Sequence, residues 1–563
     1  MSVLSKVGRF AFLIFFPLIL ESQLIPPVEH QMSLTGSFGE LRNNHFHEGY
    51  DVRKDHAIKQ NKILAVMDGF VSRISISSEG YGNMIVIEHP NGTSSLYGHL
   101  EKFNTQIAEF VHSYQYSNHT FEMDVRDLRI PVKQGDVIGI MGNTGSSRGV
   151  HLHFEMLNTK TGTKINPALY NLKIPDDYAP IFESIKIVGL DYEYNSMNSK
   201  ILNVHRKSND TFSITGDTVR MGNINIGVEV KVYDLMNANK FHVGIYKLSL
   251  LENDTLKYSV IFDSIQRNFF PNYKAHIDFA QYLENGAEYH RTYVLPGDKM
   301  SNYFYDKSNP FIGLDYNVSK KIEIIAEDYS GNKSYLNFVA LLDQNIEIPY
   351  RPAYSHHIKL GDSCEIVDDD FVIELDGYDF FKNVYFLAEK KDTNILNTYS
   401  KAIEICNNKE AFRDEIELSI KVDTFDQNID NLCIVRIDKG KRKNLGGKLI
   451  DGYIKTTVSE EGVYIVMADI SLPSIKPVRF NKNMKKYYSM SFKIDDNLVP
   501  NHISPLKYNG YIDGNWVLFE YDKKNKLITH NFEKNLYHGK HNIRIVVEDY
   551  SGNVAEYNNT FIK

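Results

Sequence analysis

The chain has 563 residues, of which 42% are hydrophobic and 24% are charged, the composition of a folded globular protein. At about 150 residues per domain, this length predicts roughly four domains. The formal net charge is -8, so the composition gives no basic surface that would favour nucleic-acid binding. We therefore expect no nucleic-acid partner.

The first residues have the features of an export signal. Lys6 and Arg9 precede an apolar run from Phe10 to Leu20, which is too short to span a bilayer but has the length of a signal-peptide core. We interpret residues 1–22 as a signal peptide or an uncleaved N-terminal anchor, and an anchor would associate the protein with a membrane. The protein is therefore expected to be exported to the periplasm or cell envelope.

Two short motifs, about a hundred residues apart, contain residue types that bind catalytic zinc. The first runs from His47 to Asp51, and the second runs from His151 to Glu155. Catalytic zinc takes three protein ligands of nitrogen and carboxylate type and keeps a fourth position for water. His47, Asp51 and either His151 or His153 supply such a set.

The second motif has the alternation of a half-buried strand. His151, His153 and Glu155 share one face, while Leu152 and Phe154 share the other. The two histidines would lie about 6.5 Å apart along the strand, so one can bind a metal while the other meets a substrate. Glu155 can equally accept a hydrogen bond that orients a ligand or take part in proton transfer.

Each motif has a simpler interpretation when it is taken alone, because His-x-His and His-x-x-x-Asp patterns often arise by chance. His45 lacks the four-residue offset to an acidic residue, and we interpret it as a surface histidine. His89 ends a predicted strand, and we interpret it as a structural histidine near the site. The combination of the motifs is therefore what favours a metal site.

Further motifs lie between the two halves in a fixed order. They are Tyr81-Gly82-Asn83, then Tyr97-Gly98-His99-Leu100, then the glycine-bounded turn from Gly135 to Gly139. In content and order, the whole series resembles the lysostaphin-type (LytM-like) zinc endopeptidases. The resemblance covers residues 32–172, which is under a third of the chain.

The resemblance implies both a fold and a division of roles among the histidines. It implies that His47, Asp51 and His153 bind Zn²⁺, and that His99 and His151 are catalytic histidines that do not bind the metal. The implied fold is the duplicated hybrid motif of LytM-like domains, with the site in a groove. The implied activity is that of an exported zinc metalloendopeptidase that hydrolyses cross-links or stem peptides of bacterial peptidoglycan.

Two other functions remain open at this point. One is a catalytically silent relative that binds cell wall or activates an amidase, although such relatives lose zinc ligands and this chain keeps all five site residues. The other is a protein whose appended β-domains act in adhesion or assembly, with the peptidase secondary. The residues alone support only metal-assisted hydrolysis.

Strand signals dominate the whole chain and predict an all-β fold. Residues 62–76 contain two β-rich runs around Asp68-Gly69, a strong hairpin signal. Residues 101–131 form an insertion whose aromatic residues either line the groove or pack as a surface loop. We expect a peptidase domain at 32–172.

The region beyond residue 175 contains an internal repeat. The phrase Glu-Asp-Tyr-Ser-Gly-Asn occurs at 327–332 and at 548–553, each time between two β-rich segments. A strand, a turn and a returning strand form the last hairpin of a β-sandwich. We therefore predict Ig-like sandwiches at 178–345 and 458–563, with a further β module at 350–457. The sandwiches are expected to support or target a peptidase that stays active on small peptides when the chain is truncated near residue 175.

Overall fold

A computed structural model describes residues 24–563, except 43–44, 173, 238–240, 308–309, 349–352, 393–394, 396–397, 407–408, 424–430, 499–505 and 534–535. The predicted export signal at 1–22 lies outside these residues. No helix in the described part of the chain is long and apolar enough to cross a membrane. The described residues are nearly all β, which confirms the predicted fold class.

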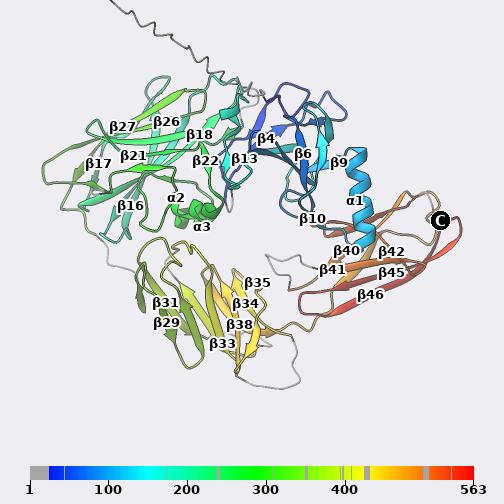
Figure 1. The fold of residues 1–563 in the computed structure, drawn as a ribbon. Helices are drawn as coiled ribbons and strands as arrows, with labels where there is room; N and C mark the ends of the chain where they lie inside the picture. The colour runs from blue at the N-terminus through cyan, green and yellow to red at the C-terminus, as the bar shows by residue number, and fades with distance from the viewer. Residues whose placement is uncertain are drawn as a thin grey trace, which may run out of the picture.

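The chain forms four β-rich units that follow one another around a ring (Figure 1). The first unit spans residues 24–172, the second 181–342, the third 356–468 and the fourth 474–562. The fourth unit, in orange and red, returns to the first, in blue, so the first and last units of the described chain are in contact.

The first unit is built around one large antiparallel sheet in the order β1-β4-β13-β8-β7-β6-β10, with a smaller sheet β5-β12-β9 beside it. Strand β13 has the predicted alternation, because Leu152 and Phe154 are fully buried in the core on the face opposite the histidines. Its neighbours are β4 on one side and β8 on the other, so the two halves of the zinc motif lie on adjacent strands. The elements are β1 (Leu34–Gly36), β2 (Leu41–Arg42), β3 (His45–Phe46), β4 (Tyr50–Arg53), β5 (Lys62–Leu64), β6 (Gly69–Ile76), β7 (Met84–Glu88), β8 (Thr93–Gly98), β9 (Leu100–Phe103), α1 (Thr105–Asn118), β10 (Met123–Val125), β11 (Ile130–Val132), β12 (Val137–Met141), β13 (His151–Asn158), β14 (Lys164–Ile165) and η1 (Pro167–Tyr170).

The predicted hairpin at Asp68-Gly69 is wrong. The two runs around it, β5 and β6, belong to different sheets, because β5 pairs with β12 while β6 pairs with β7, β10 and β11. The Asp68 carboxylate accepts a hydrogen bond from the backbone N–H of Gln134 instead of closing a two-residue turn. The local turn signal is therefore overridden by pairing with a segment 66 residues away.

The insertion contains the long helix α1. Asn104 caps its start by accepting a hydrogen bond from the N–H of Ile107, and His119, in the left-handed conformation, ends it. The last turn of α1 contacts the fourth unit, where the Trp516 ring stacks on His119 and meets Tyr116 edge-on. The insertion thus joins the first unit to the fourth.

The second unit shares one continuous hydrophobic core with the first. Strand β22 pairs with β14 of the first unit, and the fully buried Phe262, just before β22, packs against Phe46 with ring centroids 5.5 Å apart. Gly39 approaches Phe262 so closely that a Cβ there would lie 2.7 Å from the ring. The elements are β15 (Ile181–Leu190), β16 (Ser196–Arg206), β17 (Thr211–Met221), β18 (Asn225–Leu235), β19 (His242–Val243), β20 (Lys247–Glu252), β21 (Thr255–Ile261), β22 (Ser264–Ile265), η2 (Arg267–Asn272), α2 (Tyr273–His276), α3 (Phe279–Asn285), β23 (His290–Arg291), β24 (Tyr303–Tyr305), β25 (Ile312–Gly313), β26 (Lys320–Glu327) and β27 (Lys333–Leu342).

The third unit consists of two antiparallel sheets, β28-β31-β32-β38-β34-β35 and β29-β30-β33-β37-β36, which enclose a core of their own. Lys382 joins this unit to the second, where its ammonium donates to the backbone carbonyl of Tyr194. The strands are β28 (His356–Ile358), β29 (Cys364–Val367), β30 (Phe371–Leu375), β31 (Val384–Lys391), β32 (Ala402–Cys406), β33 (Ile416–Lys421), β34 (Leu432–Asp438), β35 (Lys441–Asn444), β36 (Lys448–Ile450), β37 (Tyr453–Val458) and β38 (Gly462–Ala468).

The fourth unit has two four-stranded sheets, β39-β40-β44-β43 and β42-β41-β45-β46, around a separate core. The repeated phrase forms the turn of a hairpin in both places, between β26 and β27 in the second unit and between β45 and β46 here, as the sequence predicted. The strands are β39 (Ser474–Arg479), β40 (Ser489–Asp495), β41 (Lys507–Ile512), β42 (Asn515–Val517), β43 (Glu520–Asp522), β44 (Leu527–Asn531), β45 (Lys540–Glu548) and β46 (Val554–Ile562).

The shared core predicts that the first unit depends on the second for its stability. Phe262→Ala should destabilise the contact by about 3 to 5 kcal/mol, the usual cost of removing a buried phenyl ring. Hydrogen exchange should then accelerate in the first-unit strands β2 and β3 as well as around Phe262. Phe304→Ala, which removes a ring that is 58% exposed in the same unit, is the matched control and should leave exchange in the first unit unchanged. Loss of protection confined to the second unit would contradict a shared core.

Candidate metal centre

His47, Asp51 and His153 place three ligand atoms against one another. The Nε2 atom of His47 lies 3.0 Å from Oδ1 of Asp51 and 3.1 Å from Nδ1 of His153, and that Nδ1 lies 3.0 Å from the same Oδ1. All three side chains are buried. His47 immediately follows β3 and precedes β4, Asp51 lies on β4, and His153 on β13 pairs directly with Asp51.

Hydrogen bonds on the far side of each ring decide which nitrogen carries the proton. Nδ1 of His47 lies 2.7 Å from the backbone carbonyl of Ser37, and a carbonyl can only accept, so the proton belongs on Nδ1. Nε2 of His153 lies 2.9 Å from the Glu155 carboxylate and carries the proton for the same reason. In the neutral rings, the lone pairs of His47 Nε2 and His153 Nδ1 therefore both face the Asp51 oxygen.

His99 and His151 lie beside these three residues and are held in the same way. Nδ1 of His99 donates to the carbonyl of Thr144 at 2.8 Å, and Nδ1 of His151 donates to the carbonyl of Gly149 at 2.9 Å. Their ring centroids are 4.8 Å apart, and Nε2 of His151 lies 3.4 Å from Asp51 Oδ1. Their Nε2 atoms therefore remain available as proton acceptors at the edge of the centre.

His99 has an unusual backbone conformation. It lies in the break between β8 and β9 with a φ of 62°, in the left-handed region that non-glycine residues seldom adopt. Its backbone N–H donates to the carbonyl of Tyr81 at 2.8 Å, which holds the residue in this conformation. The break turns the imidazole toward His151 and His153.

A buried network orients His153 from behind. Glu155, which is fully buried, accepts from His153 and from the Tyr81 hydroxyl at 2.6 Å, and it forms a close ion pair with Lys164. The Tyr81 hydroxyl oxygen also lies 2.9 Å from Oε2 of Glu48, and Glu48 lies 3.3 Å from the Lys164 ammonium. The sequence offered Glu155 as either an orienting residue or a proton-transfer residue, and the structure shows it orienting His153. Tyr81 was noticed only as part of a motif, and Lys164 was missed, because no local pattern joins it to the histidines.

The second oxygen of Asp51 is held by Arg42. Nη2 of Arg42 donates to Asp51 Oδ2 at 2.7 Å, which leaves Oδ1 to the two histidines. The guanidinium fits because residue 36 is a glycine, where a Cβ would lie 2.1 Å from Arg42 Nη2 and 2.8 Å from Asp51 Oδ2. Sequence reasoning missed Arg42, since a lone arginine carries no motif.

Burial and neighbouring charges shift the pKa values of the residues in the centre. Burial would raise the pKa of Asp51, but His47, His151 and His153 outweigh it and hold that pKa well below its usual value. Burial, followed by the neighbouring His153 and His151, lowers the pKa of His99 to about 3, so this ring is neutral near pH 7. Burial also lowers the pKa of His47, against the attraction of Asp51.

These residues fit a tetrahedral metal ion with nitrogen and carboxylate ligands. Ligands at about 2.0 to 2.2 Å from zinc lie roughly 3.2 to 3.6 Å from one another, close to the separations among the three donor atoms. Against the effect of burial, hydrogen bonds to Asp51 and Glu155 raise the pKa of His153 to about 9, so a metal ion bound here would replace a proton on Nδ1. His45 is half-buried rather than exposed, and it is not part of the three-residue donor group. His89 has both ring nitrogens engaged, with the Asp68 carbonyl and Ser95, which fits a structural role.

Two interlocked loops hold His99 and Tyr81 in place. One contains Gly80 and Gly82, the other Thr144 and Gly145, and Gly145 has a φ of 69°. A Cβ on Gly82 would lie 2.4 Å from the backbone carbon of Thr144, and a Cβ on Gly145 would lie 2.3 Å from the nitrogen of Gly82. Only glycine allows this approach, so the glycines position the Thr144 carbonyl that binds His99.

The fourth unit contacts both of these loops. Lys523 forms a close ion pair with Glu79, and the Lys524 ammonium donates to the backbone carbonyl of Asn143 at 3.0 Å. Both lysines lie between β43 and β44, in the orange part of Figure 1. Two residues of the last unit in the chain thus support the loops that hold the site in the first unit.

Comparison with known proteins identifies the unit that carries this centre. Residues 45–116 and 115–167 match the family model described as Peptidase family M23. Residues 45–167 are thus similar to M23 peptidase domains. Residues 356–469, which contain the third unit, match a model described as a Zu5-like domain.

Among curated proteins, this chain is 35% identical over 123 residues to the DD-carboxypeptidase/endopeptidase Mpg of Neisseria gonorrhoeae. That match covers 22% of this chain and 23% of the relative, so the chain spans less than a quarter of the relative's length. The cell division protein DipM of Caulobacter vibrioides is 25% identical over 140 residues, covering 24% of this chain and 19% of that protein.

Among solved structures, the catalytic domain of lysostaphin from Staphylococcus simulans is 23% identical, with a TM-score of 0.18. The match covers 24% of this chain and 88% of the lysostaphin domain. The M23 catalytic domain of EnpA from Enterococcus faecalis is 22% identical, with a TM-score of 0.18, and covers 24% of this chain and 89% of its own.

The interlocked glycines yield a test of the loops that does not touch a donor atom. Gly145→Ala should displace the Thr144 carbonyl and let the His99 ring turn, which should lower the turnover of the hydrolysis proposed below by about 10²-fold. Metal content should be unchanged, since none of the three donors is on this loop. Gly313→Ala in the second unit is the control, because an added Cβ there meets nothing within 4 Å. Full activity in Gly145→Ala would show that the loop does not set the position of His99.

Proposed function

We propose that this chain is an exported zinc metalloendopeptidase that hydrolyses peptide bonds in bacterial peptidoglycan. The observation that carries the proposal is the convergence of His47 Nε2, His153 Nδ1 and Asp51 Oδ1 within 3.1 Å of one another. Each is fixed from behind, by Ser37, Glu155 and Arg42. Such outer hydrogen bonds orient metal ligands and set their protonation.

The substrate class rests on the relatives. Mpg is named a DD-carboxypeptidase/endopeptidase, lysostaphin an antimicrobial peptidase, and DipM a cell division protein. These names agree with peptides of the bacterial cell wall as the substrate of the M23 domain. Export to the periplasm or cell envelope follows from that substrate and from the predicted signal at residues 1–22.

Zinc bound by His47, Asp51 and His153 would supply an activated water and polarise the scissile carbonyl. The Nε2 atoms of His99 and His151 accept the proton that the attacking water loses, because their Nδ1–H groups are already committed to backbone carbonyls. A ring that has gained this proton then donates it to the departing amine nitrogen. While protonated, the same Nε2–H can also stabilise the developing oxyanion.

A silent relative that binds cell wall or activates an amidase is the alternative. The described residues favour the enzyme, since the three proposed ligands and both auxiliary histidines are present and converge. Peptidoglycan peptides are the proposed ligand in either case, and the two readings differ in turnover.

The metal assignment predicts the effect of removing the carboxylate ligand. Asp51→Ala should abolish stoichiometric zinc and hydrolysis of purified cross-linked peptidoglycan, as measured by elemental analysis and release of muropeptides. His45→Ala is the matched control, because it removes a half-buried histidine two positions before His47 and should keep one zinc per M23 domain. An Asp51→Ala protein with full zinc would refute this ligand set.

The two auxiliary histidines should behave differently from the ligands. His99→Ala and His151→Ala should each lower turnover by about 10²- to 10⁴-fold, the usual contribution of a positioned acid or base. Zinc content should stay at one per domain in both. If His151→Ala loses zinc while His153→Ala keeps it, the roles within the His-x-His pair are reversed.

A further inference from the structure

The repeated phrase in the second and fourth units carries an acidic group that the peptidase does not use. Asp328 in the first copy lies with Asp176 and Asp234, and these residues offer carboxylate oxygens within 4.8 Å of one another. Asp549 in the second copy forms an equivalent group with Asp469 and Asp496. We call these groups the first and second Asp triads.

The two triads have the same construction. The first draws one residue from the segment that joins two units, Asp176, one from the end of a strand, Asp234 on β18, and one from the repeated turn. In the second, Asp469 follows the last strand of the third unit and Asp496 follows β40. Each triad thus lies where one unit passes into the next.

The turn asparagines tie both triads to the chain in an identical way. The side-chain NH₂ of Asn332 donates to the backbone carbonyl of Asp176 at 3.0 Å and to the Asp328 carboxylate at 2.7 Å. The NH₂ of Asn553 donates to the carbonyl of Asp469 at 2.9 Å and to the Asp549 carboxylate at 2.8 Å. The two copies of the repeat therefore share the same hydrogen-bonded arrangement as well as the same turn sequence.

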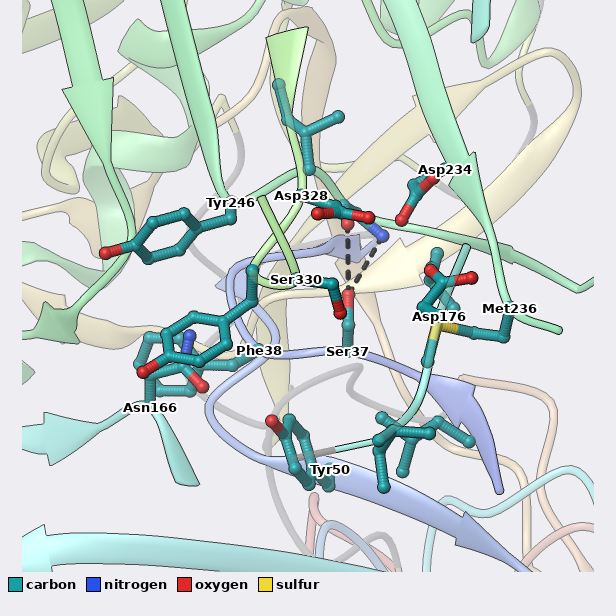
Figure 2. Close-up of a pocket in the computed structure, with 16 residues that line it drawn as sticks. Ser37, Phe38, Tyr50, Asn166, Asp176, Asp234, Met236, Tyr246, Asp328 and Ser330 are labelled. Carbon is teal, nitrogen blue, oxygen red and sulfur yellow. Dashed lines mark hydrogen bonds between the residues drawn. The ribbon is translucent and has the colours of Figure 1, made fainter. Parts of the chain in front are cut away.

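Buried carboxylate oxygens in both triads have no hydrogen-bond partner. Asp234 is 2% exposed and its Oδ1 is unpartnered, and Asp469 is 1% exposed with an unpartnered Oδ1. Oδ1 of Asp496 is likewise buried and unpartnered. Figure 2 shows the carboxylate of Asp234 facing the same space as those of Asp176 and Asp328.

No basic side chain in the described ranges forms an ion pair with any of the six aspartates. A buried carboxylate oxygen without a hydrogen bond or a counter-charge is strongly disfavoured. The first triad also borders a cavity of about 60 Å³ between the first and second units, with Ser37 and Ser330 on its wall (Figure 2). That space is large enough for an ion and coordinated water.

We propose that each Asp triad binds one calcium ion, so that the chain has two equivalent Ca²⁺ sites at its unit junctions. Calcium takes six to eight oxygen ligands at about 2.3 to 2.6 Å, so ligands on opposite sides of one ion lie up to about 5 Å apart, as these carboxylates do. Oxygen donors alone, with no histidine or cysteine, separate these sites in kind from the proposed zinc centre.

Mutual repulsion between the carboxylates favours a bound cation. Burial, followed by the nearby Asp328 charge, raises the pKa of Asp234 to about 8, and burial raises the pKa of Asp176 to about 6. Burial also raises the pKa of Asp469 and Asp496. A shared proton is the rival explanation, and it predicts no metal.

The full-length chain, stripped of metal and reloaded with one equivalent of zinc, tests the proposal. Calorimetric titration with CaCl₂ should give two Ca²⁺ per chain, and about 5 mM CaCl₂ should raise the melting temperature, because the ion binds only the folded junctions. Asp234→Asn and Asp496→Asn, which keep side-chain shape, should each leave one Ca²⁺, and the double variant should leave none. Zinc content should stay at one throughout.

Matched controls isolate the triads from the surrounding acidic surface. Asp177→Asn and Asp495→Asn alter neighbouring aspartates that bond Asn237 and Lys526, and both variants should keep two Ca²⁺. Asp51→Asn should lose zinc and keep two Ca²⁺, so failure of the zinc proposal is distinguishable from failure of this one. Absence of Ca²⁺ binding to the folded wild-type chain, binding of Mg²⁺ in preference, or two Ca²⁺ retained in the double variant would overturn the proposal.

Discussion

The geometry of the centre depends on one buried carboxylate, that of Glu155. It accepts from His153, from Tyr81 and from Lys164, and it remains ionised at zero exposure because Lys164 and His153 outweigh the effect of burial on its pKa. Lys164 lies on β14, which pairs with β13 on one side and with β22 of the second unit on the other. The protonation state of a proposed metal ligand is thus tied, through one ion pair, to a sheet that crosses between two units.

The sequence predicted the centre itself because its donors lie in two short motifs of fixed spacing. Two-residue alternation puts His151, His153 and Glu155 on one face of β13, and no distant contact is needed to infer that. Arg42 and Lys164 escaped prediction for the opposite reason. Lys164 reaches the site through strand pairing, and Arg42 reaches it through close packing against Gly36. Neither residue belongs to a motif with a fixed spacing in the sequence.

Local signals succeeded where the hydrogen bonds are local and failed where they are not. The Ser-Gly-Asn turns close between strands that are adjacent in sequence, so the repeat predicted both hairpins. The Asp68-Gly69 signal failed because Asp68 is bonded to a segment near Gln134. The predicted separability of the peptidase also conflicts with the packing, since Phe262 fills the space beneath Gly39 and against Phe46. The domain boundaries and the export signal stay predictions.

The ring arrangement gives the appended units a physical connection to the site. The second unit acts through β22 and Lys164 on the back of His153, while the fourth unit acts through Lys523 and Lys524 on the loops that hold Tyr81 and His99. The units are linked in chain order by junctions, and two of those junctions contain the Asp triads. The angles between units at these junctions therefore affect the contacts of Lys523 and Lys524 with the loops. Because those loops hold His99, the proposed proton acceptor, the fourth unit bears on the proposed chemistry through the contacts of Lys523 and Lys524.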